Sequence, residues 1–303
     1  MKQYRKCQVI MYHGVSKFGG YGTISINHFK KQILFLSNYY KFIKVDEFLG
    51  QNHSKRELLL TFDDGYHNNY EYVVPFLKKL NLPAVFFVSP HHCNGDNFLW
   101  FSYLKALQGF FPEDGFAWRG RYYDFKKKTR NQSYTLLKNE LLKLTPHPSE
   151  MYKAIYYELP KLESFVPQNI ILEYFKGMTN DELHKISNDN LFSLGLHTMD
   201  HVFLTKCTDR EAKDQIRKNM DFIHSYTSGK FSVIAYPSGD YDERILEICS
   251  KLGIHFGFSV QPKRKNWNQL DIPRFGIYSS SILKIIIKLS AGKLLRNLDF
   301  QIS

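Results

Sequence analysis

The stretch "LLLTFDDGYHNN", residues 58–69, ends an apolar run with two adjacent acids, Asp63 and Asp64. Placing two like charges at the end of a buried run is costly unless they stand in water or share a positive neighbour. Adjacent side chains of a regular strand point to opposite faces, so both acids can face one side only where the strand turns. Gly65 follows directly and accepts the backbone conformations of such a turn. The stretch predicts a strand over 57–62 with both acids at its carboxyl end.

On both sides of this stretch, short apolar runs alternate with helical patterns. Strands are predicted over 7–12, 57–62, 83–88, 191–196, 231–236 and 255–260, and helices over 27–38, 69–81, 180–187, 209–226 and 242–253. This alternation predicts a parallel sheet with helices outside it, closed as a barrel or open as a doubly wound sheet.

The alternation is interrupted from about residue 94 to about residue 176. This segment contains two tryptophans, a short basic run at 126–130 and two or three helical patterns. We interpret it as an insertion between consecutive βα units of a single domain that spans residues 1–303. A long insertion at the carboxyl ends of strands commonly builds a substrate lid, and a helical decoration remote from the site is the alternative.

The charge of +12 is spread along the chain rather than concentrated in one run. Such basicity favours acidic partners, but a solvated surface explains it better than a nucleic-acid groove, so no nucleic-acid partner is expected. Near the end, residues 281–298 are apolar with interspersed basic residues. They predict a C-terminal helix that packs against the barrel, and the same pattern permits peripheral contact with an anionic membrane surface.

The four cysteines are far apart and form no CxxC pair, which predicts reduced thiols in a cytoplasmic protein. The first residues show no signal-peptide pattern, and no run approaches the ~20 apolar residues that span a bilayer. We therefore expect a cytoplasmic protein, with membrane association left open.

Three polar clusters follow predicted strands, where active sites of α/β proteins gather. They are Asp63 with Asp64, His197 with His201, and "YPSGDYD" at 236–242. If the chain enters a helical turn at His197, four residues bring His201 back to the same side. Two imidazoles and a carboxylate make a three-ligand metal centre with an open position for water. A solvated turn and surface histidines are the alternative reading.

Four motifs in combination now carry a family resemblance. "TFDDGY" (61–66), "HTMDH" (197–201), "AYPSGDYD" (235–242) and "DIPRFGI" (271–277) resemble the polysaccharide deacetylase family, also called the NodB-homology or carbohydrate esterase 4 family. The resemblance covers residues 5–93 and 177–278. It implies a distorted (β/α) barrel, a divalent metal ion that is usually Zn²⁺, and hydrolysis of the N-acetyl group of N-acetylhexosamine units.

The resemblance also implies roles for individual residues. Asp64, His197 and His201 would be the metal ligands, and Asp63 would be the general base that activates the attacking water. A backbone N–H of the following loop would hold the oxyanion. The residues of that loop are Tyr236, Pro237, Ser238 and Gly239.

Two departures from the family pattern concern the catalytic groups. An Arg and an aromatic residue usual in the third motif are replaced by Ala235 and Ser238, and Arg274 is the candidate to orient the base instead. The late His that protonates the leaving amine has no match. "MYHGV" (11–15) is similar to an N-terminal motif of relatives that act on poly-N-acetylglucosamine, which makes His13 the candidate general acid. A His bonded to a loop carbonyl is the alternative for His13.

The resulting hypothesis is a metal-dependent deacetylase of N-acetylhexosamine in a surface glycan, or in its lipid- or nucleotide-linked precursor. The missing export signal motivates the precursor. The alternative is a non-catalytic glycan-binding or scaffold protein that keeps the barrel, and Ala235 motivates it. His91 and His92 also follow a predicted strand, and a plain loop is favoured there over a place in the pocket.

Overall fold

The computed structural model describes residues 7–50, 56–93, 95, 97–144, 146–227, 232–260 and 268–298, with backbone alone after residue 290. The strands are β1 (Gln8–Tyr12), β2 (Val15–Ser16), β3 (Ile24–Ser25), β4 (Lys41–Phe42), β5 (Glu57–Phe62), β6 (Ala84–Val88), β7 (Gly115–Trp118), β8 (Arg121–Asp124), β9 (Phe192–Leu196), β10 (Val233–Ala235), β11 (Phe256–Ser259), β12 (Ile272–Pro273) and β13 (Phe275–Gly276). The α-helices are α1 (Ile26–Ser37), α2 (Val45–Leu49), α3 (Val74–Lys79), α4 (Trp100–Phe110), α5 (Arg130–Lys143), α6 (Pro148–Lys153), α7 (Gln168–Tyr174), α8 (Asn180–Ser187), α9 (Asp209–His224), α10 (Glu243–Lys251) and α11 (Ile282–Leu298). Short helical turns are η1 (Asn69–Val73), η2 (Ala154–Glu158), η3 (Leu162–Ser164), η4 (Leu204–Lys206) and η5 (Pro237–Gly239).

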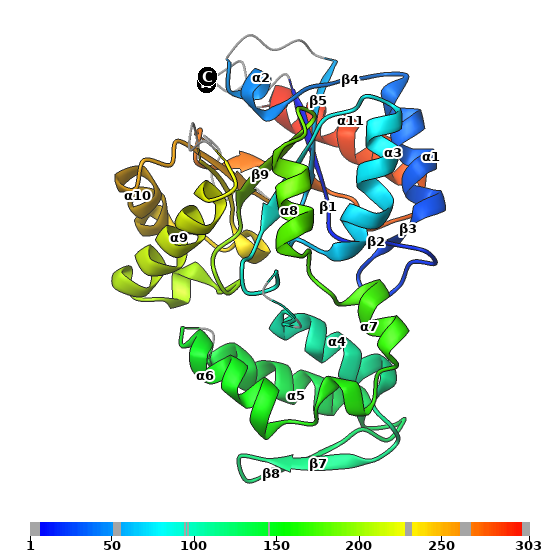
Figure 1. Cartoon of the computed structure of the whole chain (residues 1–303), viewed down its shortest axis with the longest axis vertical. Helices are drawn as coiled ribbons and strands as arrows, with labels where there is room; N and C mark the ends of the chain where they lie inside the picture. Colours follow the sequence, from blue (N-terminus) through cyan, green and yellow to red (C-terminus); the bar gives the residue numbers. More distant parts are fainter. Residues whose placement is uncertain are drawn as a thin grey trace.

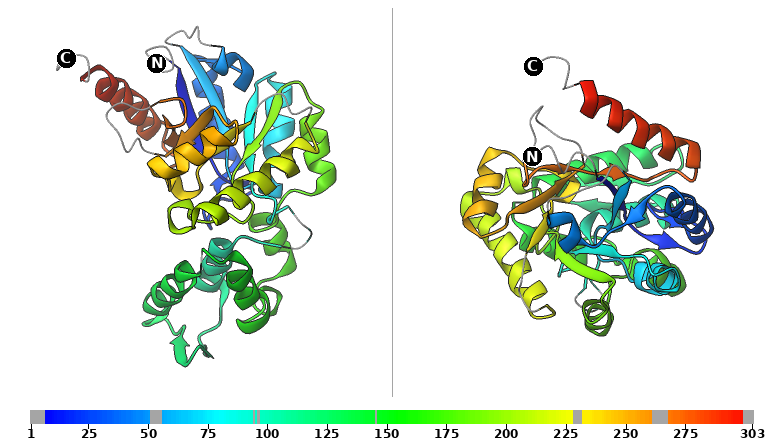
Figure 2. Two further views of the ribbon diagram at one scale, coloured as in Figure 1. Left: turned by 90° about the vertical axis from the view of Figure 1, so that its left-hand side faces the viewer. Right: turned by 90° about the horizontal axis from the view of Figure 1, so that it is seen from above.

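The main sheet is parallel throughout and closes into a barrel. Its strand order is β12-β11-β10-β9-β6-β5-β1-β13, with β4 paired to the start of β5. The two end strands are separated in the chain by Arg274 alone. The N–H of Arg274 donates to Ser259 of β11, while the N–H of Ile277 donates to Met11 of β1, so one short segment joins both edges. The (β/α) barrel is confirmed, and helices α1, α3, α8, α9 and α10 surround it (Figures 1 and 2).

Strand β5 shows why the two acids emerge where they do. Leu58, Leu60 and Phe62 pack in the core beneath the outer helices, whereas Leu59 packs in the core inside the barrel. This alternation with a period of two carries Asp63 toward the interior. Asp64 would face the helices by the same rule, but its φ of 76° and that of 77° at Gly65 turn the chain. The predicted turn is confirmed, and it begins at the second acid.

The predicted elements of the barrel agree closely with the structure. The strand over 57–62 and the helix over 180–187 have the predicted bounds. The helix expected over 69–81 is instead a π-helical turn, η1, followed by α3. Pro75 near the start of α3 has no N–H to donate, which breaks the regular hydrogen-bond ladder. Residue 231, at the start of one predicted strand, lies outside the described residues.

The segment expected as an insertion forms a lobe at one end of the barrel (Figure 1). It contains α4, α5, α6 and α7, together with an antiparallel hairpin, β7–β8, which the helical patterns did not predict. Its apolar side chains form a core of their own, separate from the two cores of the barrel. Trp100, Tyr103, Phe125 and Leu141 are among its buried residues.

Helix α11 covers the predicted C-terminal helix and lies along one side of the barrel (Figure 2). Its Ile285 and Leu289 are buried against the barrel, while Leu283 and Ile287 are exposed. Among the helices in the described ranges, none combines the length and the apolar character that a bilayer span requires. All four cysteines are buried and free of disulfides, as predicted.

Candidate active site

A cavity of about 440 Å³ opens at the carboxyl ends of the barrel strands. Barrel residues and insertion residues share its wall. The barrel and its loops contribute Met11, His13, Gly22, Asp63, Asp64, His197, His201, Phe203, Ser238, Val260 and Tyr278. The insertion contributes Trp100, Phe101, Leu104, Lys105, Tyr134 and Lys138.

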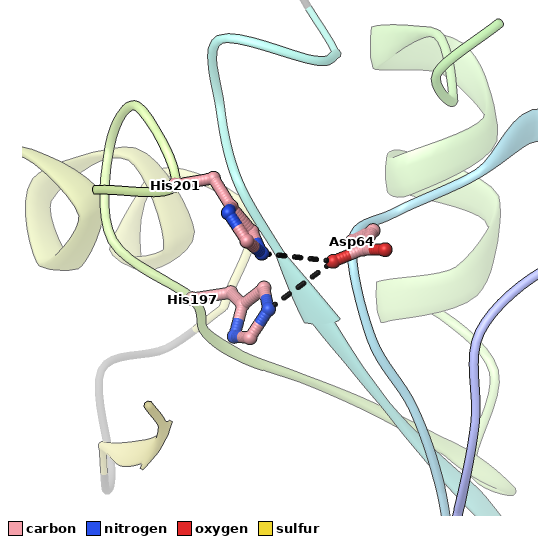
Figure 3. A group of neighbouring side chains, drawn as sticks. All are labelled: Asp64, His197 and His201. Carbon is pink, nitrogen blue, oxygen red and sulfur yellow. Dashed lines mark ion pairs between the residues drawn. The ribbon is translucent and has the colours of Figure 1, made fainter. Parts of the chain in front are cut away.

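Asp64, His197 and His201 converge in this cavity (Figure 3). The Nε2 atoms of His197 and His201 lie 3.2 and 3.3 Å from Oδ1 of Asp64. The three ligand atoms lie within 4.8 Å of one another, and all three residues are buried. Two imidazole nitrogens and a carboxylate oxygen at this spacing suit a divalent ion such as Zn²⁺.

Hydrogen bonding sets the tautomer of His197. Its Nδ1 lies 2.8 Å from the carbonyl oxygen of Ala235. A carbonyl only accepts, so Nδ1 carries the proton and the lone pair of Nε2 points toward Asp64. This arrangement is the usual one for a metal-binding histidine.

The polar atoms of Asp64 supply a test of the fit to a cation. In the described part of the chain, neither of its buried carboxylate oxygens accepts a hydrogen bond. Burial acts to raise the pKa of Asp64, whereas positive charge on His13 and on the two facing imidazoles would hold this pKa well below its usual range. A buried anion with no hydrogen-bond donor is costly unless a positive charge lies against it. The residues present therefore fit a bound cation.

Residues 197–201 do not form the helical turn predicted from their spacing. No helix occurs there, and Thr198 and His201 have positive φ angles of 58° and 51°. Left-handed backbone at non-glycine residues is strained and persists only where the surroundings hold it. The prediction of a helical turn is wrong, although the two imidazoles still lie on the same side.

The barrel holds this loop from one side. The N–H of His197 donates to Oδ1 of Asn219 at 2.6 Å, and the hydroxyl of Ser89 donates to the carbonyl of His197 at 2.8 Å. The N–H of Asp200 donates to Oε1 of Gln215 at 2.9 Å. Asn219 and Gln215 lie one turn apart on α9, so this helix fixes the start and the middle of the loop.

The insertion holds the same loop from the other side. The indole N–H of Trp100 donates to the carbonyl of His201 at 3.3 Å, and the hydroxyl of Tyr152 donates to the backbone carbonyl of Asp200 at 3.2 Å. The ring of Phe101 lies 4.7 Å from that of His201. The alternative of a decoration remote from the site is therefore wrong.

Asp63 stands in a different electrostatic setting from its neighbour. The guanidinium of Arg274 donates two parallel hydrogen bonds of 2.7 Å to Asp63, one to each carboxylate oxygen. Both side chains are buried. Burial acts to raise the pKa of Asp63, but the Arg274 guanidinium brings this pKa below its usual value. Asp63 therefore stays ionised and fixed in orientation.

Comparison with known families decides how this site is classified. A family model described as polysaccharide deacetylase matches residues 50–107 and 124–257. The chain belongs to the polysaccharide deacetylase family. The family match extends into the insertion, which the sequence resemblance had left out.

The individual relatives of this family member are distant in sequence. A poly-beta-1,6-N-acetyl-D-glucosamine N-deacetylase of Staphylococcus aureus (strain MSSA476) is 23% identical over 271 residues, which cover 87% of this chain and 71% of the relative. The structure of IcaB from Ammonifex degensii has a TM-score of 0.59 and 17% identity, covering 95% of this chain and 97% of that one. Streptococcus pyogenes deacetylase PplD in complex with acetate has a TM-score of 0.59 and 16% identity, covering 93% and 97%. These structures share the fold of this deacetylase family member.

His13 lies at the cavity wall, directly beyond the end of β1. Its ring lies 5.7 Å from that of Tyr278. Burial lowers the pKa of His13, while the carboxylates of Asp64 and Asp63 act in the opposite direction. The position fits a proton donor, because the imidazole faces the same space as the two acids.

The four residues of the loop over 236–239, all expected at the site, do not all face the cavity. Of its four residues, only Ser238 lines the cavity. Tyr236 continues the alternation of β10 toward the helices, and its hydroxyl donates to Leu270. Pro237 has no N–H, and the N–H groups of Tyr236 and Gly239 donate to Phe258 and Tyr236. Ser238 is thus the member of this loop whose N–H can serve the site.

Some residues at the site were not found from the sequence. Trp100 and Lys105 lie in the insertion, where no motif marks them. The one available signal is helical spacing, which places Trp100 beside Leu104 and Lys105 beside Phe101 on the cavity side of α4. His92 is absent from the cavity wall, and one ring nitrogen lies 3.0 Å from the backbone carbonyl of Asp64. It supports the turn rather than the chemistry.

Proposed function

We propose that this protein is a metal-dependent N-deacetylase of N-acetylhexosamine units in a surface glycan or its precursor. One observation carries the proposal. Two adjacent acids face one cavity, Asp64 opposite two imidazoles and Asp63 in the grip of Arg274. The family assignment and the poly-N-acetylglucosamine deacetylase relatives support an N-acetylated glycan as the substrate.

Asp64, His197 and His201 would hold the ion, for which we propose Zn²⁺. The ion would polarise the amide carbonyl and promote ionisation of water near neutral pH. The carbonyl of Ala235 accepts from the ring of His197, and the indole of Trp100 donates to the carbonyl of His201; these bonds would keep the imidazoles in place.

Asp63 would take a proton from the water that attacks the acetyl carbonyl carbon. Arg274 keeps this carboxylate ionised and aims it, which is the role the missing Arg at Ala235 would have had. The N–H of Ser238 would donate to the oxyanion that forms. His13 would give a proton to the amide nitrogen as the C–N bond breaks, so that acetate and a free amine leave.

The alternative of a non-catalytic glycan-binding protein was motivated by Ala235. Arg274 removes that reason, because its buried guanidinium reaches Asp63 from the segment between β12 and β13. The cytoplasmic location, the lipid- or nucleotide-linked form of the substrate and the contact with a membrane stay predictions from the sequence.

Two measurements test the proposal. Metal content of the protein as isolated should approach one ion per chain and fall sharply in His197→Ala. The metal-loaded protein should release acetate from N-acetylglucosamine oligomers or from N-acetylated sugar precursors. Full metal loading without acetate release from any of these substrates would refute the enzyme and favour the binding protein.

A further inference from the structure

The insertion presents a repeated pair of side chains to the cavity. Helix α4 contributes Phe101 and Lys105, and helix α5 contributes Tyr134 and Lys138. In each pair a lysine follows an aromatic residue by four positions, which places both on the same face of the helix. The two helices pack against each other, so both pairs reach one side of the cavity.

Lys105 lies deep in this wall. Its Nζ lies 5.1 Å from the ring centre of Phe101, and it stands so close to Gly22 that a Cβ there would come within 2.3 Å of it. Burial lowers the pKa of Lys105, and Asp64 opposes that shift. A half-buried ammonium in such a place requires a compensating anion.

No such anion is supplied by the parts of the chain that the structure describes. Neither Lys105 nor Lys138 has a carboxylate of those residues within 4.0 Å. The two acids of the cavity are already committed, Asp63 to Arg274 and Asp64 to the two histidines. The insertion side of the cavity therefore carries two lysines that have no carboxylate of the described residues in ion-pair contact.

These charges bear on which product the cavity tolerates. N-deacetylation converts a neutral amide into an amine that is largely protonated near neutral pH. Two nearby ammonium groups repel such a product and any neighbouring sugar that is already deacetylated. A substrate that carries its own anionic group offsets this repulsion.

We propose that Lys105 and Lys138 form a subsite for a phosphate group borne by the N-acetylated sugar, with Phe101 and Tyr134 against the sugar ring. This inference rests on the proposed function and narrows its substrate. Two ammonium groups match the charge of a phosphate, about −1.5 to −2, whereas one carboxylate carries a single negative charge.

Calorimetric titration of the protein as isolated tests the subsite without requiring turnover. The ligands are N-acetylglucosamine 1-phosphate, N-acetylglucosamine, inorganic phosphate and N-acetylmuramic acid, which carries a carboxylate. We expect the sugar phosphate to bind about tenfold more tightly than each of the others. Higher salt should weaken that binding and leave binding of the neutral sugar unchanged.

Variants assign the effect to the two lysines. In Lys105→Met and Lys138→Met the preference for the sugar phosphate over the neutral sugar should shrink, and Lys105→Arg should keep most of it. Lys127→Met is the matched control, since Lys127 is an exposed lysine of the same insertion outside the cavity. It should bind like the wild type.

Three results would overturn the subsite: equal binding of both sugars by the wild type, a preference that the lysine variants leave intact, or N-acetylmuramic acid bound as tightly as the phosphate. The salt dependence of the wild type decides the matter even if a variant fails to fold. A protein that prefers the sugar phosphate but releases no acetate would keep the subsite and refute the enzyme.

Discussion

The barrel and the insertion line the same cavity with different chemistry. The barrel supplies the proposed metal ligands, Asp64, His197 and His201, and the proposed proton-transfer groups, Asp63 and His13. The insertion supplies aromatic rings and lysines, and it has a hydrophobic core of its own.

The two regions therefore have different expected roles in the site. Barrel strands are fixed by ladders on both sides, so their carboxyl ends hold reacting groups at constant spacing. The insertion contacts this site through bonds to the backbone of the loop over 197–201, such as the bond from Trp100 to His201, and through the side chains that it places in the cavity wall. We expect changes in the barrel to alter the chemical step, and changes in the insertion to alter binding.

The largest effect is expected from the two acids themselves. Asp63→Asn should lower kcat by about 10²–10⁴-fold, because the proposed general base is lost, while the metal content stays that of the wild type. Asp64→Asn should lose the metal as well as the activity. Acetate release and metal analysis on both variants make the check, and loss of the metal in Asp63→Asn would show that the two acids do not divide these roles.

The next largest effect is expected from the buried ion pair between Arg274 and Asp63. Arg274→Met should lower the free energy of unfolding by about 3–5 kcal/mol, because it leaves the Asp63 carboxylate buried without its partner. The matched control is Arg244→Met, which breaks the more exposed pair with Asp209 and should cost less than about 1 kcal/mol. Chemical denaturation measures both, and equal losses would show that Arg274 does not compensate the buried carboxylate of Asp63.

A smaller effect should come from the insertion. Trp100→Phe removes the hydrogen bond to the carbonyl of His201 and should weaken metal binding by up to about tenfold. Trp118→Phe also removes one indole hydrogen bond of a buried tryptophan, but its acceptor, Glu158, lies within the insertion. Metal titration should separate the two variants. Identical affinities would mean that the insertion does not position the loop over 197–201.

The smallest effect is expected where the insertion returns to the barrel. The N–H of His67 donates to Lys176, and its ring lies 2.8 Å from Glu182 and 3.1 Å from Glu71. The ion pair with Glu182 raises the pKa of His67 although burial opposes it. Its stabilisation is therefore complete at pH below the ordinary histidine pKa and is lost as pH rises through the raised one.

His67→Gln should accordingly lower the free energy of unfolding at pH 5.5 by no more than about 1 kcal/mol, and by less at pH 9. Denaturation at the two pH values makes the measurement. His255→Gln, at an exposed position of the barrel, is the control. A loss for His67→Gln that is equal at both pH values would exclude the ion pair as its cause.

The barrel and most of its site could be predicted from local patterns. Alternation along "LLLTF" and the turn at Gly65 placed Asp63 and Asp64 at a strand end, because side-chain direction in a strand depends on neighbours in the chain. The path through residues 197–201 could not be predicted in this way. Its positive φ angles depend on α9 and the insertion, which are distant in sequence.

The sequence by itself determined six strands of the barrel, the acids and histidines at their carboxyl ends, and the family. Only the tertiary structure decided that Arg274 binds Asp63, that Ser238 is the loop member at the cavity, and that Lys105 and Lys138 line the same cavity as the acids. The physical reason is the separation along the chain over which each kind of interaction acts. Periodicity and turn chemistry act over a few residues, whereas pairing of charges and the walls of a cavity depend on segments that meet only when the barrel closes.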